Sequence, residues 1–291
     1  MSPFSDSLSM ISSLSNAKIK ETLKLRESKH RRRTKTFLID GRREIDSAVR
    51  SGIRILEIFA WDNVLQNNVQ EGSILKHCRY LNIPLCVVSE GVLQKIAFGD
   101  RNEGFVAVAQ EPERNLQAFE TAVFRQDLGH PVFLAVVENI EKPGNLGAVF
   151  RSADAAGVDG IMITYDAANP NISVEVFHPN TIRSSLGTVF HLPSVTLDSQ
   201  TAWDYLRKHG VRLALAKCDS AVPYTHYDYR PDTAVVFGSE ALGLSRIWQS
   251  GGGDGCAAVS LPMLGIADSL NVSVAAGILF YEALRQRTGE N

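Results

Sequence analysis

The second half of this 291-residue chain alternates largely apolar runs with segments of helical pattern. The apolar runs are VFLAVVENI, GIMIT, VRLALAK, TAVVFGS and CAAVSLPM, and helical stretches such as GNLGAVFRSADAAG and TAWDYLRKHG separate them. Short runs with so few polar side chains are typical of strands that are buried on both faces. Strands separated by helices form a mostly parallel sheet with helices on both sides. The pattern therefore predicts an α/β domain over residues 130–291.

The first half alternates in the same way and closes near residue 110. We expect strands at 36–41, 53–61, 84–89 and 104–110, and helices at 15–33, 42–52, 72–83 and 91–98. This order predicts a separate α/β/α domain over residues 1–111. The stretch that follows, EPERNLQAFETAVFRQDLGHP, is polar and has proline near both ends. We therefore expect a linker at residues 112–129.

Composition excludes several classes of protein. The chain is 44% hydrophobic and 21% charged, which is ordinary for a folded globular protein. Four scattered cysteines without a C-x-x-C pair, and seven scattered histidines, predict neither a disulfide framework nor a metal site. The first residues lack the pattern of a secretory signal, and no apolar stretch is clean enough to span a bilayer. A cytoplasmic protein without a membrane partner is the expectation.

Positive charge is concentrated in one segment. Residues 17–43 hold eleven lysines and arginines against three acidic residues. Such a bias favours binding to the phosphates of a nucleic acid, although a solvated helix face gives the same pattern. The candidate RNA-binding residues are Lys18, Lys29, Arg31, Arg32, Arg33, Lys35 and Arg42.

Three predicted strands are each followed by glycine and polar side chains. Gly144 and Asn145 follow the strand at 132–140, and Asn145 is a plausible helix N-cap there. Gly238 and Glu240 follow the strand at 233–239, although Gly238 also suits a plain turn. The strand at 256–263 is followed by Ser269 and Asn271. Because ligands of parallel α/β sheets bind at the carboxyl ends of strands, these loops predict a binding site.

The final helix, expected from Asp268 to residue 284, is apolar on nearly every side. A helix of this kind belongs in a protein interior. Its first turns nevertheless carry Ser269, Asn271 and Ser273. An N-cap role explains Ser269 alone, so the other two side chains point to a site at the mouth of the helix.

The common nucleotide and hydrolase signatures are absent. The sequence contains no G-x-x-x-x-G-K-[ST], no G-x-G-x-x-G and no G-x-S-x-G. The remaining prediction is a glycine-lined pocket with amide and hydroxyl groups, which suits a nucleoside-like ligand.

Three stretches carry a specific resemblance: ENIEKPGNLGAVFRSADAAG, VVFGSEALGLS and LPMLGIADSLNVSVAAGILFYEALRQR. In this order and spacing they resemble the three motifs of the SpoU/TrmH family in the SPOUT superfamily. These enzymes are RNA ribose 2'-O-methyltransferases that use S-adenosylmethionine. The likeness spans about residues 130–288. TKTFLIDGRREIDSAV and RNEGFVAVA are similar to the L30e-like RNA-binding domain of rRNA-modifying members, including thiostrepton-resistance enzymes.

The resemblance has consequences that the residue patterns alone do not predict. It implies a SPOUT trefoil-knot α/β domain, a homodimer, and S-adenosylmethionine as cofactor. It favours 23S-type ribosomal RNA as substrate, with transfer RNA as the alternative. A non-catalytic RNA-binding protein of the same fold and an enzyme acting on a small molecule are the rival classes.

The resemblance also implies which residues act. The catalytic positions it matches are Asn145, Arg151, Glu240, Ser269 and Asn271. We expect Arg151 to stabilise the developing alkoxide and the adjacent phosphate, because a guanidinium is a poor base. The cofactor-binding positions it implies are Leu215, Ala216, Lys217, Gly238, Glu240, Leu261, Met263 and Leu270.

Overall fold

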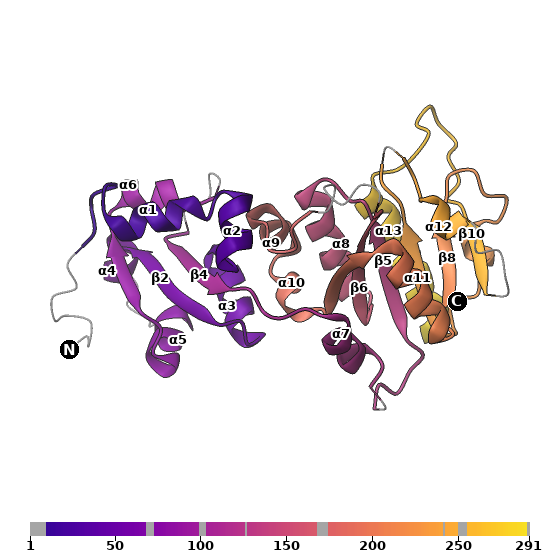
Figure 1. The fold of residues 1–291 in the computed structure, drawn as a ribbon, viewed down its shortest axis with the longest axis horizontal. Helices are drawn as coiled ribbons and strands as arrows, with labels where there is room; N and C mark the ends of the chain where they lie inside the picture. The colour runs from indigo at the N-terminus through magenta and orange to yellow at the C-terminus, as the bar shows by residue number, and fades with distance from the viewer. Residues whose placement is uncertain are drawn as a thin grey trace. The chain divides into compact units, whose positions relative to one another are not determined.

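The computed structural model describes residues 10–67, 73–98, 103–125, 127–167, 174–240, 242–249 and 255–289. The chain divides into two compact units (Figure 1). Unit 1 comprises Met1–Pro112 and Phe177–His191, and unit 2 comprises Glu113–Val176 and Leu192–Asn291.

Unit 2 is built on a six-stranded sheet in the order β10-β8-β9-β5-β6-β7. Every neighbouring pair in it is parallel, which confirms the predicted mostly parallel sheet. Five of its six strands were predicted, although β10 ends four residues earlier than expected, and β7 was not predicted. The strands are β5 (Phe133–Glu138), β6 (Gly160–Tyr165), β7 (Ser194–Asp198), β8 (Arg212–Ala216), β9 (Thr233–Phe237) and β10 (Cys256–Val259).

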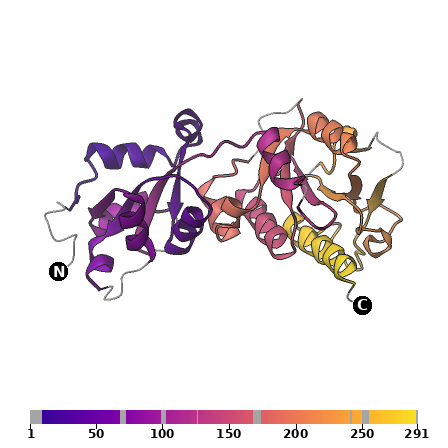
Figure 2. The ribbon, with the colours of Figure 1, turned by 90° about the horizontal axis from the view of Figure 1, so that it is seen from below.

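Helices cover both faces of this sheet, as Figure 2 shows for the C-terminal helix and the helices opposite it. On one face Phe119, Leu206 and Trp248 are buried in a common apolar cluster with the strands. On the other face Phe280 makes edge-to-face contacts with Phe133 and Phe237. The first face carries α7 (Leu116–Val123), α11 (Ser199–Lys208) and α12 (Arg246–Gln249), and the second carries α8 (Pro143–Ala155) and α13 (Val272–Thr288).

Residues 112–129, which we expected to form a linker, contain helix α7. Asn115 caps this helix by accepting a hydrogen bond from the Ala118 amide at 2.8 Å. Phe119 and Val123 are then buried in the core of unit 2. The polar composition of the segment describes only the exposed face of a helix that belongs to the folded unit.

Helix α13 begins later than expected, at Val272. Its N-cap is Asn271, whose Oδ1 accepts hydrogen bonds from the amide and the hydroxyl of Ser273. Ser269 therefore lies before the helix and does not cap it. One face of α13 is buried, whereas Val274 is 50% exposed and Tyr281 is 53% exposed. In the single chain this apolar helix is only half covered.

Unit 1 has a four-stranded sheet in the order β1-β4-β2-β3, between two layers of helices (Figure 1). Ile19, Leu93 and Ile96 pack on one of its faces. This arrangement confirms the predicted α/β/α order. The strands are β1 (Thr36–Asp40), β2 (Ile55–Trp61), β3 (Leu85–Val88) and β4 (Phe105–Gln110). The helices are α1 (Ala17–Lys24), α2 (Ser28–Thr34), α3 (Arg42–Arg50), α4 (Asp62–Asn67), α5 (Ser73–Leu81) and α6 (Glu90–Ile96).

The basic segment forms two helices, where we expected one. Asn16 caps α1 by accepting a hydrogen bond from the Lys18 amide at 2.9 Å. The chain turns after Leu25, and the buried Arg31 of α2 donates to the carbonyl oxygens of Leu25 and Arg26 at 2.8 Å each. Arg31 thus holds the turn between the helices together.

A segment from the second half of the sequence completes unit 1. It contains α9 (Pro179–Ser185) and α10 (Thr188–His191). Phe177 stacks on Phe37 of β1 with ring centroids 4.4 Å apart. The Ser47 hydroxyl of α3 donates to the Gly187 carbonyl at 2.9 Å. The sequence patterns did not predict this long-range assembly.

Candidate active site

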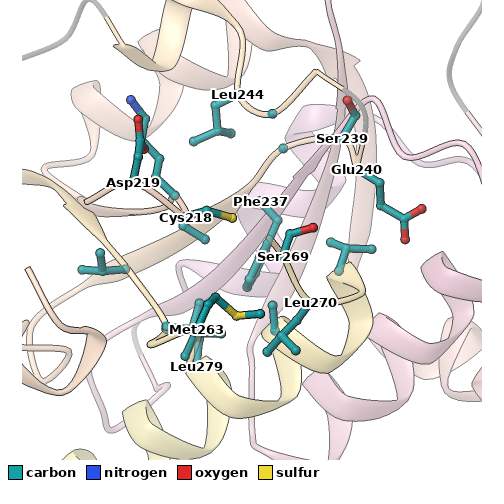
Figure 3. Close-up of a pocket in the computed structure, with 18 of the residues that line it drawn as sticks. Cys218, Asp219, Phe237, Ser239, Glu240, Leu244, Met263, Ser269, Leu270 and Leu279 are labelled. Atoms are coloured by element: carbon teal, nitrogen blue, oxygen red, sulfur yellow. The ribbon is translucent and has the colours of Figure 1, made fainter. Parts of the chain in front are cut away.

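A cavity of about 430 Å³ lies at the carboxyl ends of β8, β9 and β10 in unit 2. Figure 3 shows that Met263, Leu270 and Leu279 gather on one side of it, away from Leu244. The lining residues come from three loops and the first turns of α13. They are Ala216, Lys217, Cys218, Asp219, Phe237, Gly238, Ser239, Glu240, Leu242, Gly243, Leu244, Val259, Leu261, Met263, Ser269, Leu270, Val272, Ala275 and Leu279.

The loop after β9 is folded tightly back on itself. The Ser239 amide donates to the Gly243 carbonyl at 3.1 Å, and the Gly243 amide donates to the Ser239 carbonyl at 3.0 Å. A Cβ atom on Gly238 would lie 2.2 Å from the Gly243 carbonyl carbon, and Gly243 has φ +65°. Both glycines are needed for this turn, since a side chain would clash at one and strain the backbone at the other.

The loops after β8 and β10 are joined to each other. The Lys217 amide donates to the Val259 carbonyl at 2.9 Å, and the Tyr224 amide donates to the Ser260 carbonyl at 2.9 Å. The next residues of the β10 loop bring Leu261 and Met263 to the cavity. The three strand ends therefore build one continuous wall with exposed backbone and an apolar floor.

Side chains from all three motifs meet at the edge of this cavity. The Glu240 Oε1 atom accepts hydrogen bonds from Asn145 Nδ2 at 2.7 Å and from Asn271 Nδ2 at 3.0 Å. Asn271 Nδ2 also lies 3.2 Å from Asn145 Oδ1. Lys142 Nζ lies 3.0 Å from Glu240 Oε2. Residues that are far apart in the sequence thus form one hydrogen-bonded cluster.

A second cavity, of about 260 Å³, adjoins the first across this cluster. It shares Gly238, Ser239, Glu240 and Val272 with the first cavity. Its other lining residues belong to the loop after β5 and the start of α8: Asn139, Ile140, Glu141, Lys142 and Asn145. Two adjacent spaces separated by a polar cluster suit two reactants that must meet.

The predicted N-cap role of Asn145 is wrong. Helix α8 begins at Pro143, its N-cap is Lys142, and Asn145 lies in the first turn. Proline suits this first position because its fixed φ is helical and it needs no hydrogen-bond acceptor. The Asn145 side chain is thereby free of the capping role and donates to Glu240.

Two of the predicted site residues lie away from both cavities. Arg151 is an exposed residue of α8 and lines neither space. Leu215 is buried in the core of unit 2, on β8. The other positions that the resemblance implied line one of the cavities or belong to the cluster. These are Asn145, Ala216, Lys217, Gly238, Glu240, Leu261, Met263, Ser269, Leu270 and Asn271.

Sequence reasoning missed several residues of the site. Lys142 stands between a predicted strand and a predicted helix, so its place at the strand end was the available signal. Cys218 and Asp219 follow β8 in the same manner. Leu279 lies on the third turn of α13 and reaches the cavity only through the packing of that helix.

In unit 1, the basic side chains differ in their surroundings. Arg31 is 5% exposed and bound to backbone carbonyls, so we correct its assignment from RNA contact to structure. Lys18 Nζ lies 2.8 Å from Glu57 Oε2, and Arg42 lies over the Phe105 ring. The exposed members of the group on and beside α2 are Lys29, Arg32, Arg33 and Lys35.

Within the described ranges, no helix combines the length and apolarity needed to cross a membrane. Across the same ranges, no group of three or more histidine, cysteine, aspartate or glutamate residues is arranged to hold a metal ion.

Two family models match the chain. Residues 132–281 match the SpoU rRNA Methylase family, and residues 16–107 match the MRM3-like substrate binding domain.

Similar proteins cover nearly the whole chain. The 23S rRNA (guanosine(2553)-2'-O)-methyltransferase RlmP of Bacillus subtilis (strain 168) is 28% identical over 94% of this chain and 98% of its own length. The 23S rRNA (uridine(2479)-2'-O)-methyltransferase of Streptomyces viridochromogenes is 30% identical over 94% of this chain and 91% of its own. Among solved structures, the SpoU methyltransferase AviRb of Streptomyces viridochromogenes, in complex with AdoMet, has a TM-score of 0.78 and 26% identity. That match covers 95% of this chain and all of the other.

Proposed function

Because this chain belongs to the SpoU rRNA methylase family, we propose that it transfers the methyl group of S-adenosylmethionine to a ribose 2'-hydroxyl of ribosomal RNA. The observation that carries the proposal is the cluster of Asn145, Glu240 and Asn271 between two adjoining cavities. The relatives named as 23S rRNA methyltransferases support ribosomal RNA over transfer RNA.

The larger cavity fits the cofactor in size and chemistry. Its volume of about 430 Å³ is within the range of small-molecule sites. The apolar side chains of Leu261, Met263 and Leu279 suit a purine ring, and the loop backbone at Lys217 and Gly238 supplies polar groups. When bound there, S-adenosylmethionine supplies an electrophilic methyl carbon on a sulfonium centre.

The smaller cavity is the proposed place of the target nucleotide. Glu240 and Asn145 line it, and Asn271 joins them, so the ribose is held beside the wall shared with the cofactor cavity. Methyl transfer needs the 2'-oxygen, the methyl carbon and the departing sulfur in line. The cluster orients the hydroxyl, and Ser269 at the cavity edge adds a further hydroxyl for this task.

The hydroxyl must lose its proton as the new bond forms, and this proton passes to solvent water. Glu240 is the carboxylate nearest the two cavities' junction, but its oxygens already accept from Asn145, Asn271 and Lys142. We assign it to orientation. Arg151 stabilises the developing alkoxide and the neighbouring phosphate, because a guanidinium offers several donors and a permanent charge.

Arg151 reaches a site only if a second copy of the chain supplies it. It lines neither cavity, although it shares α8 with Asn145. On the neighbouring helix α13, Val274 and Tyr281 expose apolar surface. We assign these helices to a homodimer interface that brings Arg151 of one copy to the cavities of the other.

Unit 1 is the proposed RNA-binding part of the chain. Four exposed basic residues on and beside α2 are its proposed contacts with RNA phosphates: Lys29, Arg32, Arg33 and Lys35. Lys18 and Arg42 are retained as weaker candidates, because Glu57 pairs with the first and Phe105 packs against the second. The domain boundaries near residue 112, the trefoil knot and a cytoplasmic location are parts of the same proposal.

A methyl-transfer assay tests the proposed function. Purified protein is incubated with S-adenosylmethionine carrying a tritiated methyl group and, separately, with unmodified ribosomal RNA and transfer RNA. We expect label in ribosomal RNA. Label in transfer RNA alone would move the substrate to the other class, and binding of RNA without cofactor binding would favour a non-catalytic protein.

A further inference from the structure

The carboxylate of Glu138 is buried beside the site, and the proposed reaction does not use it. Glu138 is the last residue of β5, at the centre of the sheet, and its exposed fraction is 0%. A buried carboxylate is costly unless donors surround it. Its position at the carboxyl end of a central strand puts it directly beneath the loops that form the cavities.

Four donors satisfy this carboxylate. Glu138 Oε2 accepts from the Ser245 amide at 2.7 Å. Glu138 Oε1 accepts from Ser245 Oγ at 2.7 Å, Trp248 Nε1 at 2.8 Å and Ser199 Oγ at 2.5 Å. Three of the four come from the stretch 245–248, which directly follows the loop at 238–244 that walls the cofactor cavity.

The N-terminal part of the same loop, residues 238–243, is held by hydrogen bonds within its own turn. Gly238 and Gly243 close against each other, and the Leu242 amide donates to Ser239 Oγ at 2.9 Å. Leu244 lies between this turn and Ser245, is 5% exposed, and lines the cavity. Glu138 therefore attaches the C-terminal end of the loop, at Ser245, to strand β5.

We propose that Glu138 is a positioning residue for methyl transfer, which fixes the 238–245 loop in its cofactor-binding shape without touching either reactant. This inference rests on the proposed function, because it takes the larger cavity as the cofactor site. Strong hydrogen bonds to a buried charge make the loop rigid before the ligand arrives, which reduces the cost of binding.

The direct test replaces the carboxylate by an amide of the same shape. In Glu138→Gln one of the two carboxylate oxygens becomes an NH₂ group facing a donor, so one of the two contacts with Ser245 is broken or reversed. We expect the Kd for S-adenosylmethionine, measured by calorimetry well below the melting temperature, to rise roughly tenfold. At saturating cofactor, kcat should stay within about twofold, so that the change appears in KM.

Asp159→Asn is the matched control. Asp159 Oδ2 accepts from the Phe133 amide at 2.7 Å, at the opposite end of the same strand. This change alters a carboxylate that binds backbone and leaves the cavity loops intact, so cofactor Kd should equal that of the wild type. A rise in Kd in both variants would mean that the effect is general destabilisation, and would overturn the proposal.

Ser245 provides a second, milder test if Glu138→Gln does not fold. Ser245→Ala removes one hydroxyl bond to the carboxylate, and Ser245→Thr keeps a hydroxyl there. Ser245→Ala should raise the cofactor Kd several-fold, and Ser245→Thr should leave it near the wild-type value. Equal Kd values in Ser245→Ala and the wild type would contradict the proposal.

Failure of the proposed function gives a different result. A wild-type protein that binds S-adenosylmethionine but labels no RNA contradicts the reaction, while the Kd comparison between variants still decides the role of Glu138. A wild-type protein that does not bind the cofactor overturns both.

Discussion

Lys142 forms an exposed ion pair at the edge of the site. Its Nζ atom lies 3.0 Å from Glu240 Oε2, and the residue lines the smaller cavity. An exposed ion pair of this kind adds little stability. Its position therefore matters more for a charged ligand than for folding, and an RNA backbone is such a ligand.

Lys142→Met should weaken RNA binding and spare the cofactor. We expect the KM for RNA to rise several-fold, because one cation is removed from the cavity. The slope of log K for RNA binding against log salt concentration should decrease in magnitude by about one. Cofactor Kd, measured in parallel, should stay unchanged. Lys208→Met, at an exposed position on α11, is the control. Equal effects from both substitutions would refute a specific contact at Lys142.

Asp40 in unit 1 gives a pH dependence of stability. Burial raises the pKa of Asp40 to about 6, although the hydrogen bond from the Phe98 amide and the nearby Arg183 oppose the change. The folded state therefore binds a proton more tightly than the unfolded state does. Below the unfolded pKa of 3.8 the two states are equally protonated, and stability falls as the pH rises from there to about 6.

Asp40→Asn should remove this loss of stability with rising pH. Its side-chain oxygen can still accept from the Phe98 amide, so the variant should be more stable than the wild type above pH 6 by about 1–2 kcal/mol. The difference should shrink as the pH falls towards 4. Chemical denaturation of the full chain at several pH values checks this. A difference that does not change with pH would show that Asp40 does not titrate in this window.

At the scale of elements, Arg287 attaches the end of α13 to the segments that lead into β5 and β9. The Arg287 guanidinium donates to the carbonyl oxygens of Pro131, Val132, Tyr229 and Pro231. Its carbon atom also lies 4.7 Å from the Phe133 ring centroid. Burial lowers the pKa of Arg287, whereas the nearby carboxylates of Asp159 and Asp232 oppose this change. The helix that carries Asn271 at its start is thus held at its far end.

Arg287→Ala should be strongly destabilising, because four backbone carbonyl oxygens lose a charged donor at once. We expect a loss of about 3 kcal/mol in the free energy of unfolding. Arg285→Ala, on the exposed side of the same turn, should have a much smaller effect. Chemical denaturation monitored by circular dichroism distinguishes them. Equal losses in the two variants would refute the anchoring role of Arg287.

The strands of unit 2 were predictable because they are buried on both faces. In β5 all six residues are buried, and the polar Glu138 comes only at the end of the apolar run. The edge strand β7 was not predicted because polar and apolar residues alternate in it, and Thr196 is exposed. Helix α7 was not predicted either, because only Phe119 and Val123 of its residues are buried.

Part of the site was also predictable, within limits. Asn145, Glu240 and Asn271 each follow a strand, and parallel strand ends meet at one edge. The hydrogen bonds that join them depend on how α8 and α13 pack, which no local pattern describes. The same limit explains why the packing of segment 177–191 was not predicted. Phe177 and Phe190 are core residues because they stack on Phe37, which is far from them in the sequence.

At the scale of the whole molecule, the proposed homodimer is what makes Arg151 part of the site. The residue is exposed and outside both cavities of its own chain. A two-fold dimer places identical surfaces against each other, so each copy supplies the same missing group to its partner. The half-covered α13 gives such a contact apolar surface to bury.

Mixing two inactive variants tests this arrangement. Arg151→Ala and Glu240→Ala should each abolish most turnover, with a barrier increase of about 3 kcal/mol for the arginine and little change in its cofactor Kd. In a mixed dimer one site has both residues intact, so re-associated mixtures should recover roughly a quarter of wild-type activity. Mixed dimers that form, as seen by native mass spectrometry, but stay inactive would contradict supply of Arg151 by the partner.

In the proposed reaction, the cluster of Asn145, Glu240 and Asn271 directs a methyl group to a ribose oxygen. The most direct measurement is the chemical position of the transferred methyl in ribosomal RNA treated with the purified protein. A 2'-O-methyl group removes the nucleophile that alkali needs, so the next phosphodiester survives hydrolysis. We predict that the label is recovered in one alkali-resistant dinucleotide and then in a 2'-O-methylated nucleoside. Label on a base, released by alkali as a mononucleotide, would contradict the account.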